Sequence, residues 1–171
     1  MKISRRGTEM PASPIRRLVP YAEAAKKEGV HVYHLNIGQP DIHTPEKMMD
    51  GFKNTDIKVL AYGHSGGLWE YREKLAEYYN SFDINVSKEE ILVTSGGSEA
   101  IIFAMMSTMD EGDEIIIPEP FYTNYNGFAR EAGVKIVPVT SRIEENFKLP
   151  PIADLEAKIT GKTKAIMKCN P

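Results

Sequence analysis

The chain has 171 residues, of which 42% are hydrophobic and 26% are charged, and this composition excludes a wholly disordered protein. The formal net charge of −3 argues against a nucleic-acid-binding protein that depends on bulk positive charge. The longest strongly apolar run, Ile101–Met106, is too short to span a membrane, and the basic start, Met1–Pro14, lacks the apolar core of a secretory signal. The single cysteine, Cys169, cannot form an internal disulfide, so we expect a cytoplasmic protein.

The first part of the chain is predicted to be an arm followed by a helix. Residues 1–13 mix charged residues with Gly, Pro and Ser, as an arm does. Pro14 then opens a helix over residues 15–27, because a proline in the first turn loses no hydrogen bond. Pro20 must kink or interrupt this helix, and Gly29 ends it.

An irregular segment, Asn36–Pro45, separates this helix from the next one. The next helix is predicted to run to Phe52, with Thr44 as its N-cap. A glycine-rich turn over residues 63–67 then leads into an amphipathic helix, Leu68–Phe82, whose apolar residues recur every three or four positions.

Beyond residue 90, strands and helices alternate at the spacing of βαβ units. The predicted strands are Ile91–Thr94, Glu114–Ile117, Val134–Val139 and Lys164–Lys168. The predicted helices are Glu99–Met109, Phe121–Ala132 and Ile152–Ile159. The strands are continuous apolar runs, which is typical of a sheet covered by helices on both faces. The pattern therefore predicts an α/β fold with a mostly parallel sheet.

A candidate phosphate site lies where the first of these strands meets its helix. Gly96, Gly97 and Ser98 form this junction. The first turn of a helix presents N–H groups and a partial positive charge, and glycine lets a ligand approach the backbone. The alternative is ordinary helix capping by Thr94 or Ser95, and the junction alone does not decide between the two.

Other catalytic and metal motifs have little support. The stretch around Ser98 resembles the nucleophile elbow G-x-S-x-G, but Ala100 replaces the last glycine and all four histidines precede the serine. Neither G-x-G-x-x-G nor the P-loop pattern occurs. His31 and His34 lie three residues apart in an extended stretch and would face opposite sides, so we expect no metal site.

Two further stretches are candidates for ligand contacts. Pro118–Tyr125 follows a strand and carries aromatic residues at its carboxyl end, where a ring could stack or could simply cover the sheet. Leu35–Asp41 contains a Gly-Pro turn whose amides could hold a carboxylate.

Taken together in chain order, these stretches make the sequence resemble the class I/II aminotransferases, which are pyridoxal-phosphate enzymes of fold type I. Five stretches carry the resemblance: NIGQPD at Asn36–Asp41, AYGHSGGLWEYREKLAEYY at Ala61–Tyr79, ILVTSGGSEAI at Ile91–Ile101, DEIIIPEPFYTNY at Asp113–Tyr125 and AIMKCNP at Ala165–Pro171. The pattern is most similar to the aspartate-aminotransferase-like branch.

The resemblance implies a role for each matched position. The turn 96–98 would hold the phosphate of pyridoxal 5′-phosphate, and Tyr122 would stack on its ring. Gly38 would meet the substrate α-carboxylate, and Tyr62 would reach the cofactor phosphate of a partner subunit. The family therefore implies a homodimer with shared active sites, acting on amino-acid and 2-oxo-acid substrates, with no metal, nucleic acid or membrane involved.

The resemblance also implies that these residues are the front part of a longer chain. Residues 1–44 correspond to the arm and a small-domain segment, and residues 45–171 to the first part of the cofactor-binding large domain. The family's first strand, here 91–94, lies at one end of the sheet and is separated from the next three by strands from later in the chain. The family's Schiff-base lysine lies beyond the matched positions, so we expect no catalytic residue here.

Three alternatives stay open: a non-catalytic phosphate-ligand-binding module or truncated remnant, a β-lyase, and a decarboxylase. The groups that select among the family's chemistries lie beyond the matched positions.

Overall fold

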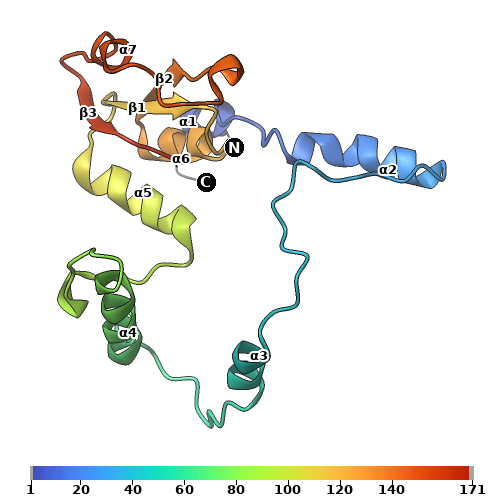
Figure 1. Cartoon of the computed structure of the whole chain (residues 1–171), viewed down its shortest axis with the longest axis vertical. Helices are drawn as coiled ribbons and strands as arrows, with labels where there is room; N and C mark the ends of the chain where they lie inside the picture. The colour runs from blue at the N-terminus through green and yellow to red at the C-terminus, as the bar shows by residue number, and fades with distance from the viewer. Residues whose placement is uncertain (1, 170–171) are drawn as a thin grey trace. The chain divides into compact units, whose positions relative to one another are not determined.

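The computed structural model describes residues 2–169 and divides the chain into two compact units. One unit comprises residues 34–94, and the other comprises residues 1–33 and 95–171. The helices of the first unit are α3 (Glu46–Lys53), α4 (Trp69–Asn80) and the 3-10 turn η2 (Lys88–Glu90). The second unit contains α1 (Arg5–Thr8), η1 (Arg16–Leu18), α2 (Val19–Lys27), α5 (Gly97–Thr108), β1 (Glu114–Glu119), α6 (Tyr125–Ala132), β2 (Lys135–Thr140), η3 (Ile143–Glu145), α7 (Ile152–Glu156) and β3 (Thr163–Ile166) (Figure 1).

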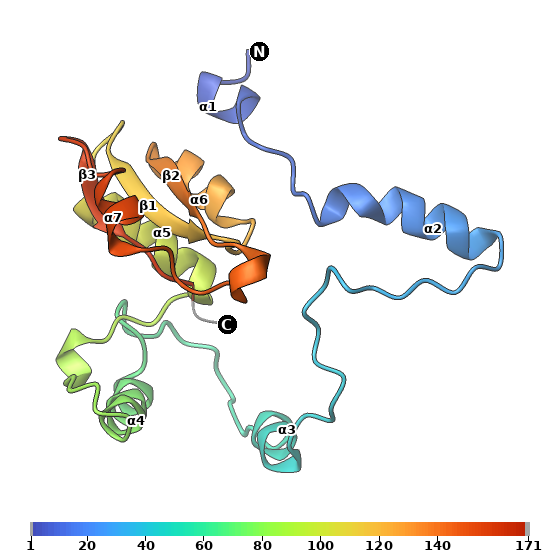
Figure 2. The same cartoon turned by 45° about the horizontal axis from the view of Figure 1, so that its top comes forward.

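A parallel sheet of three strands organises the second unit. The strand order is β2-β1-β3, and both pairings are parallel. In β1, Ile115 is aligned with Ile136 of β2 on one side and with Ala165 of β3 on the other. Helices α5 and α6 lie on one side of the sheet and α7 on the other (Figures 1 and 2). The predicted α/β fold with a parallel sheet is confirmed.

The central strand β1 carries the core. Ile116 and Ile117 are both 0% exposed, and successive residues of a strand face opposite sides of the sheet. Ile115 and Ile117 therefore face the same side, where they join a buried cluster with Met105 of α5, Ala129 of α6, and Met109 and Val134, which follow these helices. Burial on both faces explains why this strand is an unbroken apolar run.

A polar cluster fixes the amino end of the sheet. The Glu114 carboxylate is buried and accepts hydrogen bonds from Lys135 Nζ at 2.9 Å and from Thr160 Oγ1 at 2.7 Å. The bond from Lys135, followed by the bond from Thr160, lowers the pKa of Glu114. These two contacts link the start of β1 to β2 and to the turn before β3.

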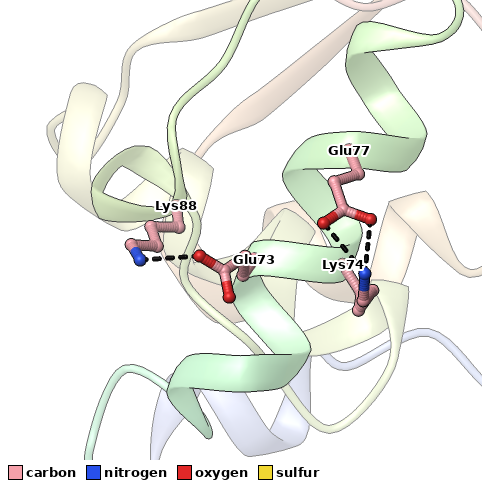
Figure 3. Close-up of polar contacts among 4 residues, drawn as sticks. All are labelled: Glu73, Lys74, Glu77 and Lys88. Atoms are coloured by element: carbon pink, nitrogen blue, oxygen red, sulfur yellow. Dashed lines mark hydrogen bonds and ion pairs between the residues drawn. The ribbon is translucent and has the colours of Figure 1, made fainter.

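The unit of residues 34–94 is built around α4. Two ion pairs lie on this helix (Figure 3): Lys74 to Glu77 at 2.7 Å within the helix, and Lys88 of η2 to Glu73 at 2.8 Å. The contact with Lys88 lowers the pKa of Glu73 and raises that of Lys88. The ion pair between Lys88 and Glu73 fixes η2 against α4.

Cationic groups of Arg72 and Lys88 each lie 4.8 Å from the centre of the Trp69 ring. Arg72 is buried, with 6% of its surface exposed, and its Nη2 donates to the carbonyl of Glu89 at 3.3 Å. The guanidinium of Arg72 thus stacks on Trp69 within α4 and joins α4 to η2 through the hydrogen bond to Glu89.

The predicted strand at Ile91–Thr94 is wrong as a sheet member. These residues have no strand assignment, and the sheet of the described residues begins with β1. One backbone bond, from Val93 N to Gly66 O at 3.0 Å, connects the segment to the glycine-rich turn. A single bond to a turn does not make a ladder, because strand pairing needs a neighbouring strand in register.

Several helix boundaries differ from the predicted ones by a few residues. Helix α5 begins two residues earlier than predicted, at Gly97, and α6 begins four residues later, at Tyr125. The N-cap of α3 is Pro45, not Thr44. Helix α7 ends at Glu156, three residues before the predicted end.

The break predicted near Pro20 occurs between η1 and α2, with Pro20 in the first turn of α2. Gly29 follows the end of α2 with φ +81°, as its predicted role requires. Helix α1 was not predicted; in it Ser4 Oγ accepts from Gly7 N at 3.1 Å. Across residues 2–169, no helix has the length and apolar character needed to cross a membrane.

Candidate functional site

The amino end of α5 presents an exposed backbone turn at Gly96 and Gly97. Gly96 is the N-cap residue with φ +81°, a conformation that favours glycine, and Gly97 is the first helical residue. A Cβ built on either glycine would meet no atom within 4 Å. The turn therefore borders open space, and its N-cap residue is Gly96.

Glu99, in the first turn of α5, stabilises the glycine turn through one backbone hydrogen bond. Its Oε2 accepts a hydrogen bond from the backbone N–H of Ser95 at 2.6 Å. Ser98 is exposed beside it. The amides of Gly97 and Ser98 belong to the first helical turn, where an α-helix supplies no acceptor. Glu99 was not among the predicted site residues, although an acidic residue three positions after the N-cap was an available signal.

Tyr122 lies in the loop that follows β1 and has 45% of its surface exposed. Its hydroxyl accepts a hydrogen bond from Asn124 Nδ2 at 2.6 Å. The ring of Tyr125 meets the Tyr122 ring edge-on, with centroids 5.4 Å apart and planes at 88°. These contacts hold the Tyr122 ring at its hydroxyl end and along one flank. Asn124 was missed by sequence analysis.

Tyr125 is partly buried and packs against the core. It stacks on Phe121 at a centroid distance of 6.1 Å, and its hydroxyl donates to Cys169 Sγ at 3.7 Å. Burial raises the pKa of the Tyr125 hydroxyl, and the bond to Cys169 raises it further. Tyr125 therefore stays a neutral phenol that anchors the loop of Tyr122 to the core.

The topology places the glycine turn and Tyr122 at the same edge of the sheet. Helix α5 ends near the start of β1 and runs back along it, so its amino end lies toward the carboxyl end of β1 (Figure 1). Tyr122 follows that carboxyl end. Open parallel sheets bind ligands at this edge.

Two other predicted site residues, Gly38 and Tyr62, belong to the unit of residues 34–94. Gly38 is exposed, and no atom lies within 4 Å of a Cβ built on it. Tyr62 is 107% exposed, so its ring makes almost no contact within its own unit. The last two residues of the matched stretch AIMKCNP, Asn170 and Pro171, lie outside the described residues.

A cavity of about 510 Å³ lies elsewhere in the second unit, between the arm and the start of α6. It is lined by residues that include Glu9, Pro11, Thr123, Asn124 and Arg130. Glu9 and Arg130 form an ion pair at its rim. The turn 96–98 is not part of its lining, so the cavity and the candidate phosphate turn are separate features.

The turn 96–98 has the properties that a phosphate ester requires. It combines first-turn amides, an exposed Ser98 hydroxyl and space that side chains at positions 96 and 97 would fill. The helix behind it has twelve residues, so its partial positive charge is fully developed at this end. The residues present therefore fit the phosphate of the predicted cofactor. Within residues 2–169, His, Cys, Asp and Glu side chains form no group of three that could hold a metal ion.

Comparisons with known proteins show which family this chain matches. The model of the family described as aminotransferase class I and II matches residues 30–171. A (5-formylfuran-3-yl)methyl phosphate transaminase from Methanocaldococcus jannaschii is 32% identical over 171 residues, which is 99% of this chain and 44% of that protein. An aspartate aminotransferase from Thermotoga maritima is 30% identical over 99% of this chain and 45% of that protein.

Solved structures give the same result. The crystal structure of the Thermotoga maritima aspartate aminotransferase matches with a TM-score of 0.85 at 31% identity, covering 96% of this chain and 44% of that one. A mutant of the Thermus thermophilus aspartate aminotransferase matches with a TM-score of 0.83 at 31% identity, covering 97% and 44%. The chain thus spans less than half the length of the curated relatives and the solved structures that it matches.

Proposed function

Because the chain belongs to the class I and II aminotransferases, we propose that it is the amino-terminal part of an enzyme that transfers an amino group from an amino acid to a 2-oxo acid with pyridoxal 5′-phosphate. The observation that carries the proposal is the exposed glycine turn at the amino end of α5. In this proposal residues 1–44 are the arm and a small-domain segment, and residues 45–171 begin the cofactor-binding domain.

The first role of this chain is to bind the phosphate group. The amides of Gly97 and Ser98 and the Ser98 hydroxyl donate to phosphate oxygens, and the α5 dipole favours the negative charge. Gly96 and Gly97 leave the space that the oxygens need. Glu99 supports this role indirectly, because it takes the Ser95 N–H and so fixes the turn without occupying that space.

The second role is to hold the cofactor ring and the substrate. Tyr122 presents an exposed, hydrogen-bonded ring at the carboxyl edge of the sheet, where it stacks on the flat pyridine ring. Gly38 offers an unhindered backbone amide to the substrate α-carboxylate. Tyr62, which makes almost no contact within its unit, donates its hydroxyl to the cofactor phosphate of a partner subunit in a homodimer.

When bound, pyridoxal phosphate supplies the electron sink for the transfer. The residues of this chain bind and orient the cofactor; the lysine that moves the proton is assigned to a part of the protein beyond residue 171. We therefore place no catalytic residue within the chain. We also propose a cytoplasmic location and a role in amino-acid metabolism, in keeping with the single cysteine and the named relatives.

The decisive experiment measures cofactor binding and turnover in the full-length protein that carries these residues. We expect a visible absorption band with pyridoxal phosphate, and amino transfer from one member of an amino-acid panel, beginning with aspartate, to a 2-oxo acid. Ser98→Ala should weaken cofactor binding by about 10- to 100-fold, the loss of a hydrogen bond to a charged group. Ser107→Ala, in the last turns of α5, is the matched control and should bind normally.

Other outcomes identify the alternative functions. Release of ammonia and a 2-oxo acid without a new amino acid indicates a β-lyase, and release of carbon dioxide indicates a decarboxylase. Binding of inorganic phosphate or simple phosphate esters without the visible band indicates a non-catalytic phosphate-binding module. Absence of any phosphate-dependent binding at the turn 96–98 would contradict the proposal.

A further inference from the structure

Asn124 is the N-cap residue of α6, but it does not cap the helix. Asparagine is among the best N-cap residues because its side-chain oxygen accepts a hydrogen bond from the first turn. Here the backbone of Asn124 is already α-helical, with φ −70° and ψ −16°, and no side-chain cap bond is made. Its amide instead donates to the Tyr122 hydroxyl at 2.6 Å. The residue therefore serves the loop of Tyr122 rather than the helix.

This bond restrains the direction in which the Tyr122 side chain extends. A tyrosine side chain turns about two torsions, and Tyr122 is 45% exposed, so solvent alone would not fix its plane. Tyr125 restrains the ring along one flank, at 88°. The bond to Asn124 holds the distal oxygen. Asn124 thus fixes the direction of the Tyr122 side chain and Tyr125 restrains the plane of its ring, while nearly half of the residue stays exposed.

We propose that Asn124 is a positioning residue for the cofactor: by bonding the Tyr122 hydroxyl, it fixes the direction in which the Tyr122 side chain extends, and so the place where its ring stacks on the pyridine ring. The inference rests on the proposed function, since it needs Tyr122 to be the stacking residue. It goes further in that it assigns a role to a side chain that does not itself touch the cofactor. A ring set in advance loses less freedom when the cofactor binds, and this strengthens binding.

The test is a double-mutant cycle on the native full-length protein. The four proteins are the wild type, Asn124→Ala, Tyr122→Phe, which keeps the ring but removes its oxygen, and the double variant. The measurements are the Kd for pyridoxal phosphate and the visible circular dichroism of the bound cofactor, which reports how its ring is held. We expect each single variant to raise the Kd by about 3- to 10-fold, the loss of one hydrogen bond. The double variant should be no worse than either single one.

Asn126→Ala is the matched control, because Asn126 lies in the first turn of the same helix and its side chain donates to the backbone carbonyl of Thr123 at 3.2 Å. It should leave both the Kd and the dichroism unchanged. If Asn124→Ala raises the Kd equally with Tyr and with Phe at position 122, or changes neither quantity, the positioning role is overturned while cofactor binding stands. A wild-type protein that does not bind pyridoxal phosphate would overturn the proposed function and this inference with it.

Discussion

The backbone N–H of Val93 donates a hydrogen bond to the carbonyl of Gly66 at 3.0 Å, and this contact joins two segments with different proposed tasks. Gly66 belongs to the turn that follows Tyr62, the residue assigned to the partner's cofactor. Val93 lies in the segment that leads into the turn 96–98. This bond therefore links the two segments within one unit, before the chain enters α5.

The adjacent glycine makes this junction sensitive to substitution. Gly67 has φ +101°, and a Cβ on it would lie 2.4 Å from Val93 Cγ2 and 2.6 Å from Val93 Cβ. We expect Gly67→Ala to lower the free energy of unfolding by about 2–4 kcal/mol, from backbone strain and overpacking together. Chemical denaturation measures this change. Gly51→Ala in α3, where a Cβ meets nothing within 4 Å, is the control, and equal stability of the two variants would contradict the predicted clash.

Arg72 is predicted to stabilise the same unit through its packing. Its buried guanidinium covers Trp69 and bonds the carbonyl of Glu89. Arg72→Ala should cost about 2–4 kcal/mol, because it removes buried stem contacts, a cation–π contact and a charge-assisted hydrogen bond. Thermal melting followed by circular dichroism tests this expectation. Lys74→Ala, which removes an exposed ion pair on the same helix, should melt like the wild type, and a melt of Arg72→Ala indistinguishable from it would argue against the role.

Replacing Gly97 by alanine should weaken cofactor binding without lowering the stability of the fold. Alanine at this first helical position meets no atom within 4 Å, so stability should stay constant or rise by at most about 1 kcal/mol. The added methyl group fills the space assigned to the phosphate, so the Kd for pyridoxal phosphate should rise by about 10-fold or more, or ~1.4 kcal/mol. Fluorescence titration and thermal melting measure the two effects.

Gly127→Ala in α6 is the comparison for Gly97, because its Cβ also meets nothing within 4 Å in a helix. This variant should be as stable as Gly97→Ala and should bind the cofactor normally. Normal cofactor binding by Gly97→Ala would mean that the turn does not hold the phosphate.

The Glu114 cluster predicts a pH dependence of stability. Hydrogen bonds from Lys135 and then Thr160 lower the pKa of Glu114 in the folded state. A lowered pKa stabilises the fold above the ordinary carboxyl value of about 4.3, and the stabilisation is lost as the pH falls through the folded-state pKa. Glu114→Gln should therefore melt at a lower temperature than the wild type at pH 7, and the difference should shrink below about pH 4.

Melting curves recorded from pH 7 to pH 3 measure this dependence. Glu144→Gln, at an exposed position in η3, controls for the change of net charge. A gap between Glu114→Gln and the wild type that persists at pH 3 would show that the carboxylate charge is not what stabilises this end of the sheet.

The alternation of apolar runs and helical periods was enough to predict the parallel sheet, because each βαβ unit is encoded locally. The segment Ile91–Thr94 shows the limit of this reasoning. Its composition is that of a buried strand, but a strand exists only with a partner, and pairing is not a local property. The start of α6 was placed too early for a related reason: residues 121–124 leave the helix to serve the Tyr122 loop.

The parts of the candidate site that depend on backbone conformation could be predicted from the sequence. The contacts between side chains could not. Gly96 was identified because a glycine between a strand and a helix lets a ligand approach the backbone, and the structure gives it a positive φ beside open space. Asn124 and Glu99 were missed, since their contacts depend on the way the loop and the first helical turn fold. Tyr122 was identified through the family resemblance, and the environment that restrains it came from the structure.

Because β2, β1 and β3 are parallel, the two ends of the sheet carry different groups of residues. The amino end carries Glu114 and its partners, and the carboxyl end leads to Tyr122. The stability of one end can thus be varied apart from the proposed cofactor site at the other, and libraries that vary the two ends can be screened separately and then combined.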